Sequence, residues 1–160
     1  FINKAFYPSS IVQTSDLDQY APMSWEDVNW LLENGHMIGA HTKSHPILSK
    51  IENKKQLFNE IVLSANRMER EIDTKINCFA FPFGTVQSIN NEIVGAAKKR
   101  FDFVFSNVRG SVLESPDRGF IFRQNIVPGD PVWLIRMMVD GRLDWKYYRT
   151  RNEARNRYSI

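Results

Sequence analysis

The sequence predicts an α/β fold in which parallel strands form a sheet and helices cover its outside. Two observations predict it: short apolar runs suited to strands alternate with amphipathic helical patterns, and polar turns separate them. No repeat or low-complexity segment interrupts this order. Strands that alternate with helices are typical of a parallel sheet, because each helix returns the chain to the start of the next strand.

The first part of the chain is predicted to contain a strand, a helix and a second strand. The apolar and aromatic stretch at 1–7 is typical of a strand, and a proline follows it. Ser24 is expected to cap a helix, with Asp27 completing a capping box and Gly35 ending the helix. A short apolar strand is expected at 37–40.

The longest predicted helix spans about 54–73, because its apolar residues recur at helical spacing and form one stripe. The stripe consists of Leu57, Phe58, Ile61, Val62, Ala65, Met68 and Ile72. The polar residues expected outside the stripe, facing solvent, are Glu60, Asn66, Arg67 and Arg70. The stripe is expected to pack into the core and not against a cofactor.

Further elements are predicted in the second half of the chain. They are strands at 76–81, 101–105 and 120–127 and a helix at 89–100, with a polar loop at 107–119. A last helix is expected to be capped by Asp130, with Pro131 in its first position and Gly141 after its end.

Composition predicts one globular domain with a basic end. The 160 residues, 42% hydrophobic and 12% aromatic, can bury a core, and no apolar run is long enough to span a membrane. Cys78 is the single cysteine, which excludes an internal disulfide. We expect a solvated basic helix at 142–160, since its charges are interrupted. The alternative is a tail that binds nucleic acid or anionic lipid.

Two histidines follow the predicted strand at 37–40. His41 and His45 are four residues apart, in a loop held by the proline after His45, and two neutral imidazoles so placed can bind one divalent metal ion. The alternative is a pair of surface histidines in a turn capped by Thr42 and Ser44. His36, which follows Gly35, is expected to be satisfied by the backbone at the helix end.

Two motifs and their spacing resemble one family. The segment 41–46, HTKSHP, resembles the H-[ST]-x-x-H-P motif of polysaccharide deacetylases, carbohydrate esterases of family four with the NodB homology domain. The segment 79–84, FAFPFG, resembles the F-A-Y-P-Y-G variant of a second motif of that family. One long helix separates the motifs here as in the family, and Arg123 is similar to a late-strand arginine of the same variant. The resemblance covers the chain to about Gly141.

The resemblance implies a distorted, incomplete (β/α) barrel and a divalent metal, usually zinc, held by an aspartate and two histidines. It implies that His41 and His45 are the histidine ligands, that the Phe83 N–H stabilises the oxyanion, and that Arg123 orients a carboxylate. The residues expected to line a groove for sugar rings are Phe81, Pro82 and Trp133. The domain is expected at 1–141, with the basic segment 142–160 after it.

The family's aspartate pair has no counterpart, since no Asp-Asp sequence occurs in the chain. The family's late leucine-histidine motif is also missing, because no histidine follows His45. We expect the first strand, with these aspartates, to lie upstream of Phe1. The predicted function is therefore metal-dependent removal of N-acetyl or O-acetyl groups from a polysaccharide or amino sugar, incomplete in this chain. The alternative is a non-catalytic carbohydrate-binding or scaffolding protein. A homo-oligomer that covers the open barrel edge is a further expectation. No nucleic-acid partner is expected, and no compartment is predicted.

Overall fold

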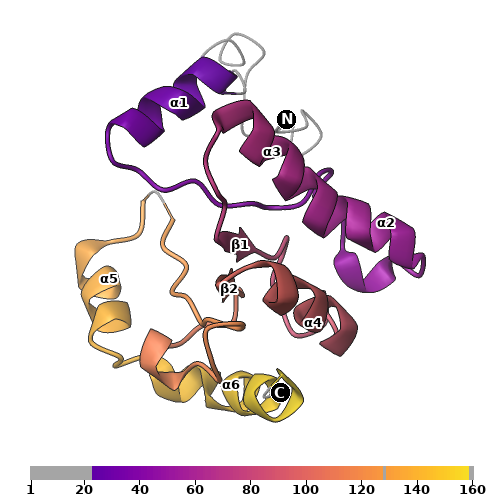
Figure 1. The fold of residues 1–160 in the computed structure, drawn as a ribbon. Helices are drawn as coiled ribbons and strands as arrows, with labels where there is room; N and C mark the ends of the chain where they lie inside the picture. The colour runs from indigo at the N-terminus through magenta and orange to yellow at the C-terminus, as the bar shows by residue number, and fades with distance from the viewer. Residues whose placement is uncertain (1–22, 128, 159–160) are drawn as a thin grey trace, which may run out of the picture.

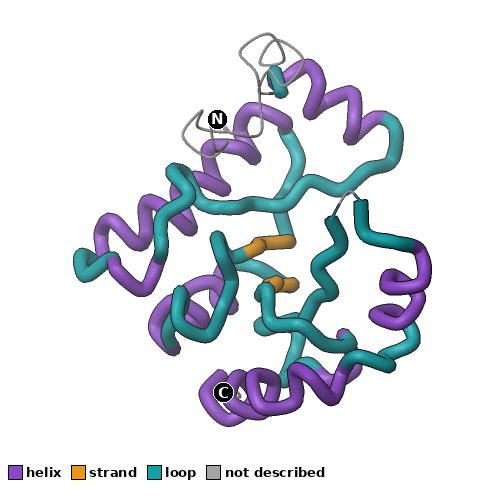
Figure 2. Tube along the Cα trace, turned by 180° about the vertical axis from the view of Figure 1, so that it is seen from behind, coloured by secondary structure: helices purple, strands orange, loops and turns teal. Residues whose placement is uncertain are grey.

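The computed structural model describes residues 23–127 and 129–158, so the strand predicted at 1–7 lies outside the described residues. Strands β1 (Cys78–Ala80) and β2 (Phe103–Phe105) pair in parallel, with Cys78 opposite Phe103. Isolated parallel bridges place Ala40 beside β1 and Ile121 beside β2. Helices surround these central strands (Figures 1 and 2). The predicted α/β arrangement is confirmed, although the strands expected at 37–40 and 120–127 contribute only these bridges.

Helix α1 (Trp25–Glu33) begins as predicted. The Ser24 side chain accepts the N–H of Asp27, and the Asp27 carboxylate accepts the N–H of Ser24, so both halves of the capping box are present. Gly35 has a φ of +81° just after the helix end, a conformation that glycine adopts without a steric penalty. The α1 helix packs against α3.

The long predicted helix is present but contains an irregular turn. It comprises α2 (Lys54–Phe58), the π-helical turn η4 (Asn59–Leu63) and α3 (Ser64–Ile72). Leu57, Ile61 and Ala65 are buried as expected. The prediction for Glu60 is wrong: this side chain is buried, with 5% of its surface exposed. Glu60 lies at the edge of the buried stripe, one residue before Ile61, and the loop at 43–44 covers its carboxylate.

Three further helices follow the predicted order: α4 (Asn91–Arg100), α5 (Val132–Val139) and α6 (Asp144–Tyr158). Two short 3-10 turns, η3 (Leu48–Lys50) and η5 (Val112–Glu114), were not predicted. Gly141, with a φ of +70°, follows α5 as expected. Asp130 does not cap α5: Pro131 takes the cap position without a side-chain hydrogen bond, and the Asp130 carboxylate instead accepts the N–H of Val127.

Aromatic side chains fill the centre of the molecule. The ring of Phe79 in β1 stacks on Phe101 with centroids 5.0 Å apart and meets Phe81 edge-on at 5.2 Å. Phe120 contacts Tyr158, the last described residue of α6, at 4.5 Å. Aromatic pairs of this kind add to the free energy gained by burying their area. The central strands are therefore held on a core that includes the end of α6.

Helix α6 is not the solvated basic tail that composition predicted. Tyr158 is fully buried, and its hydroxyl lies 3.1 Å from the carbonyl oxygen of Val86 and 3.2 Å from that of Ile89. Arg151 is 3% exposed, with its Nε 3.0 Å from Glu114 Oε2. The prediction of a solvated helix from the charge pattern was wrong, because three residues of α6 are buried: Arg151, Ala154 and Tyr158. The boundary predicted at 141 stays a prediction.

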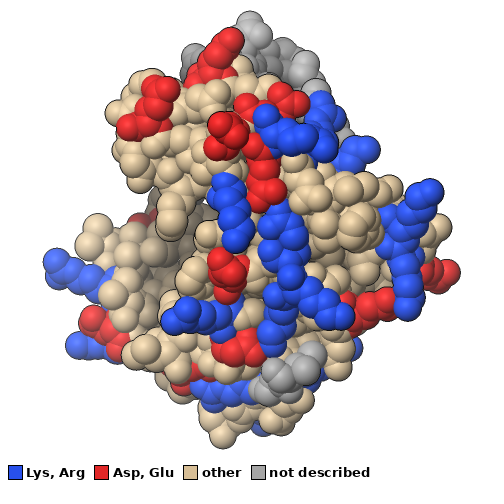
Figure 3. Space-filling view, viewed as in Figure 1, with Lys and Arg blue, Asp and Glu red and all other residues tan. Residues whose placement is uncertain are grey.

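Charges of both signs are interspersed on the face shown in Figure 3, and they do not form a single basic surface there. Part of the basic charge near the end of the chain is used within the fold, since Arg155 also pairs with Glu114 at 3.5 Å. In the part of the chain that the structure describes, no helix is both long and apolar enough to cross a membrane.

Candidate active site

The rings of His41 and His45 lie beside each other after the bridge at Ala40. Their centroids are 4.8 Å apart and their planes meet at 68°. His41 Nδ1 is 2.7 Å from the carbonyl oxygen of Ala80, the last residue of β1. Because a carbonyl oxygen only accepts, Nδ1 carries the proton and Nε2 keeps its lone pair. The sheet therefore fixes both the position and the tautomer of His41.

These two imidazoles fit a shared metal ion. With a metal–nitrogen distance of about 2.1 Å and tetrahedral angles, two imidazoles on one zinc ion have centroids about 5 Å apart, close to the separation here. A ligating histidine commonly donates its other N–H to a backbone carbonyl, as His41 does. Partial burial lowers the pKa of His41 below 6.5, with contributions from His45 and Arg123, so the ring is neutral at pH 7.

In the described residues, no third metal-ligating side chain lies beside His41 and His45. Within residues 23–127 and 129–158, no group of three or more histidine, cysteine, aspartate and glutamate side chains could hold a metal ion. Catalytic zinc sites usually have three protein ligands and one open position. The described residues thus bring two imidazoles together without a third side chain of this kind.

The backbone of the histidine loop adopts an uncommon conformation. Thr42 has a φ of +65° and His45 a φ of +57°, both in the left-handed region that residues other than glycine rarely occupy. The Thr42 hydroxyl oxygen accepts the N–H of His45 at 3.1 Å. The carboxylate of Glu60 accepts the N–H groups of Lys43 and Ser44. Residues held in such conformations cluster at active sites.

Phe83 occupies a tight turn beside the histidines. The N–H of Gly84 donates to the carbonyl of Pro82 at 2.6 Å, which closes a γ-turn around Phe83 with φ of +59°. The Phe83 ring meets the ring of His45 with centroids 5.0 Å apart and remains 44% exposed. The two motif segments, 41–46 and 79–84, therefore meet at His45, as expected from the resemblance.

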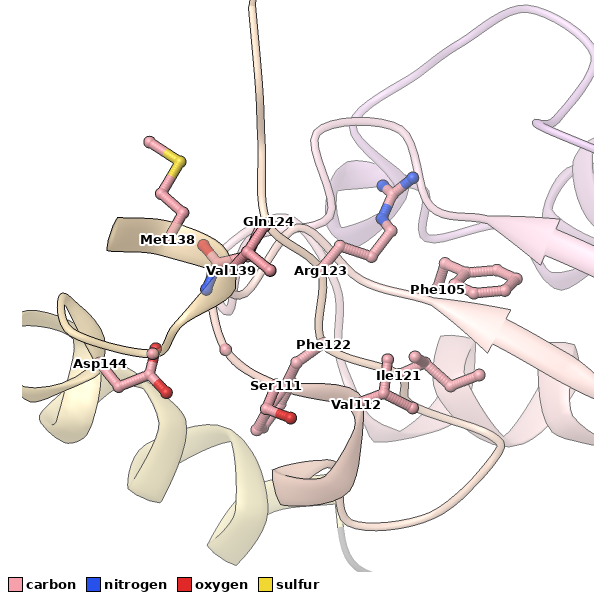
Figure 4. Close-up of a pocket in the computed structure, with 12 residues that line it drawn as sticks. Phe105, Ser111, Val112, Ile121, Phe122, Arg123, Gln124, Met138, Val139 and Asp144 are labelled. Atoms are coloured by element: carbon pink, nitrogen blue, oxygen red, sulfur yellow. The ribbon is translucent and has the colours of Figure 1, made fainter. Parts of the chain in front are cut away.

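Arg123 follows the bridge at Ile121. Its Nε donates to the carbonyl of Ser106 at 2.6 Å, which directs the guanidinium along the end of β2. It lies close enough to His41 to help lower the pKa of that ring. Arg123 and Gln124 also line a cavity of about 380 Å³ between the end of β2, α5 and α6 (Figure 4). The Gln124 Oε1 atom is buried and accepts no hydrogen bond from the described residues.

Two of the three predicted groove residues are buried. Phe81 is 1% exposed and packs between Phe79 and Phe120, so it cannot contact a sugar ring. Pro82 is also buried. Trp133 is 63% exposed on α5, and its role in a sugar groove stays a prediction. The apolar motif predicted a wall, but its residues just after β1 pack into the aromatic core instead.

Glu60 is the site residue that the sequence analysis missed. Its carboxylate contacts the loop between the two histidines, whereas the helical spacing predicted that it would face solvent. The signal that could have found it is weak, since one glutamate beside an apolar stripe is ordinary in an amphipathic helix.

A family model described as polysaccharide deacetylase matches residues 9–101, more than half of the 160 residues. The chain belongs to the polysaccharide deacetylase family. The match contains both histidines and the Phe83 turn and ends before Arg123. No match was found among curated proteins.

Solved structures of polysaccharide deacetylases share this fold. BA0330 from Bacillus anthracis and the polysaccharide deacetylase BC0361 from Bacillus cereus each superimpose with a TM-score of 0.64 and 20% identity over 78% of this chain. The Streptococcus pyogenes deacetylase PplD, solved in complex with acetate, superimposes with a TM-score of 0.63 and 17% identity over 77% of this chain. The chain spans 39% of each Bacillus protein and 54% of PplD.

Proposed function

We propose that this polysaccharide deacetylase family chain supplies the histidine side of a site that removes N-acetyl or O-acetyl groups from a polysaccharide or amino sugar. The observation that carries the proposal is the pairing of His41 and His45 in one loop, with the tautomer of His41 set by Ala80. We further propose an incomplete (β/α) barrel with its domain at 1–141, followed by the basic segment 142–160.

The proposed roles follow from the chemistry of each group. His41 and His45 would hold a divalent metal, for which we propose zinc. Such a metal, when bound, polarises the acetyl carbonyl and lowers the pKa of a bound water. The Phe83 N–H would stabilise the negative oxygen of the tetrahedral intermediate. Arg123 would orient a carboxylate. This chemistry also needs a base and a third metal ligand. In the described residues, no group of three or more histidine, cysteine, aspartate and glutamate side chains lies together to supply them.

A zinc titration against a competing chelator tests the metal ligands. His41→Ala should weaken zinc binding by about 100-fold or more, because it removes one of two imidazole ligands. His36→Ala is the matched control: His36 lies outside the loop, after Gly35, and its removal should leave zinc binding nearly unchanged. Equal losses from both variants would mean that the site is placed wrongly.

The second candidate is a non-catalytic carbohydrate-binding protein. The specific observation that favours it is the lack of a three-ligand cluster in the described residues. Release of acetate from an acetylated amino-sugar oligomer, measured with zinc present and with His41→Ala as control, separates the two candidates. Acetate release that the substitution abolishes supports the enzyme. Oligomer binding without acetate release supports the binding protein.

A further inference from the structure

We propose that Glu60 is a positioning residue that holds the loop between His41 and His45 in the conformation that binds metal. The inference rests on the proposed function, because it takes His41 and His45 as metal ligands. It assigns their loop conformation to a residue on a different element. Glu60 does not touch either histidine ring in any contact described here. It acts through the backbone of Lys43 and the backbone and side chain of Ser44.

Three hydrogen bonds connect Glu60 to the loop. Its Oε2 accepts the N–H of Lys43 and the N–H of Ser44, both at 2.9 Å, and its Oε1 accepts the hydroxyl of Ser44 at 2.7 Å. Hydrogen bonds to a carboxylate are stronger than those between neutral groups. Because Glu60 is only 5% exposed, water competes weakly for them. A buried carboxylate persists when such bonds compensate the loss of its hydration.

The helix is irregular at the position of Glu60. Ser64 donates its N–H to the carbonyl of Asn59, five residues back, where a regular α-helix would use the carbonyl of Glu60. The Ser64 hydroxyl donates instead to the Glu60 carbonyl at 2.5 Å. A π-helical turn is rare and occurs often at functional sites. Here it lies at the residue whose side chain reaches the histidine loop.

The bonded segment is also the one under backbone strain. Lys43 and Ser44 lie between Thr42 and His45, which both have positive φ. Such conformations persist where surrounding contacts fix them. The Thr42–His45 hydrogen bond closes the loop from within, and Glu60 fixes it from outside. Loss of Glu60 should therefore loosen the loop conformation that keeps the centroids of the His41 and His45 rings 4.8 Å apart.

Substitution of Glu60 in the full chain tests the proposal. Zinc affinity is measured with a competing chelator, and amide hydrogen exchange at 43 and 44 is measured without metal. Glu60→Ala should lower zinc affinity by about 10- to 100-fold and accelerate exchange at both amides. Glu60→Gln should rescue most of the loss, because the amide oxygen still accepts both N–H groups and the amide nitrogen can donate to the Ser44 hydroxyl.

Glu71→Ala is the matched control, since Glu71 lies on the same helix and its side chain is 41% exposed. It should change neither readout. Unchanged zinc affinity and unchanged amide exchange in Glu60→Ala would overturn the proposal, as would the same losses in Glu71→Ala. If Glu60→Ala does not fold, Ser44→Ala replaces it: this variant removes one of the three bonds and should still accelerate exchange at 43 and 44. No acceleration there would equally overturn the proposal.

The proposed function can fail separately. If the unsubstituted chain binds no zinc, the metal assignment is wrong, and the metal-free amide exchange still decides whether Glu60 holds the loop. If the chain binds zinc and Glu60→Ala leaves both readouts unchanged, the metal assignment stands and the positioning role is wrong.

Discussion

At the scale of single residues, three of the four non-glycine residues with positive φ in the described part of the chain gather where the two family motifs meet, and the fourth, Asp73, ends α3. Thr42, His45 and Phe83 all have positive φ, although none is glycine. The contacts of neighbouring elements fix them: Glu60 bonds the histidine loop, and the Phe83 turn packs on 106–107. The proposed metal site would benefit from such a loop, because a loop with few alternative conformations holds two rings in fixed relative positions.

Gly84 should tolerate no side chain. A Cβ there would lie 2.6 Å from the Asn107 nitrogen, and the φ of +56° is unfavourable for alanine. Gly84→Ala should lower the free energy of unfolding by about 2 kcal/mol or more, measured by urea denaturation. Gly95→Ala is the control, because Gly95 lies within α4 with open space around it and should gain about 1 kcal/mol. Equal stability of the two variants would contradict the strain assigned to the turn.

At the scale of elements, one carboxylate joins three of them. Glu69 on α3 accepts the N–H of Ile76 at 2.9 Å, and its Oε1 is 2.8 Å from Nη2 of Arg100 at the end of α4. Arg100 also donates to the carbonyl of Ile76 at 3.3 Å. Glu69 and Arg100 therefore fix the segment that enters β1, and β1 in turn positions Ala80 below His41.

This arrangement predicts a pH dependence of stability. Partial burial acts to raise the pKa of Glu69, but the Ile76 N–H and Arg100 outweigh it, so the pKa lies below its ordinary 4.5. The unfolded chain therefore binds the proton at higher pH than the folded one. The contribution of Glu69 is fully present above about pH 4.5 and is lost as pH falls through the lower folded pKa.

Glu69→Gln should accordingly cost about 1 kcal/mol near pH 7, and the difference from the parent chain should shrink below pH 4.5. Urea denaturation at a series of pH values measures it. Glu71→Gln, on the exposed side of the same helix, should show no such convergence. A difference between Glu69→Gln and the parent that is constant down to pH 3 would refute the assignment.

At the scale of the whole molecule, α6 packs its last residue, Tyr158, into the core. Tyr158 contacts Phe120 and reaches the carbonyls of Val86 and Ile89, just beyond the Phe83 turn. Arg151 is buried between Glu114 and Asp144. The basic sequence thus serves the fold, and a binding surface for nucleic acid has less charge available than composition suggests.

Tyr158→Ala should lower the free energy of unfolding by about 3–5 kcal/mol, since it leaves a cavity in the aromatic core and removes the hydroxyl that donates to the carbonyls of Val86 and Ile89. Thermal unfolding followed by circular dichroism measures the change. Tyr148→Ala on the same helix removes a side chain that is 58% exposed and should change stability little. A small effect of Tyr158→Ala would contradict the contribution of α6 to the core and would indicate an appended tail.

The sequence by itself determined the family, the order of helices and strands, and the two histidines as a pair. These depend on local signals: the capping box at Ser24, the stripe at 54–73, and two short motifs with fixed spacing. Such signals act within a few turns of the chain, so they can be identified without the fold.

Tertiary structure alone decided which of the neighbouring residues face the site. Phe81 and Phe83 belong to one motif, yet parallel pairing buries the first and the γ-turn exposes the second. Glu60 is buried because the loop at 43–44 bonds its carboxylate, and Tyr158 enters the core because α6 packs on it. Each outcome depends on contacts between segments far apart in sequence, where the free energy of packing outweighs local preference.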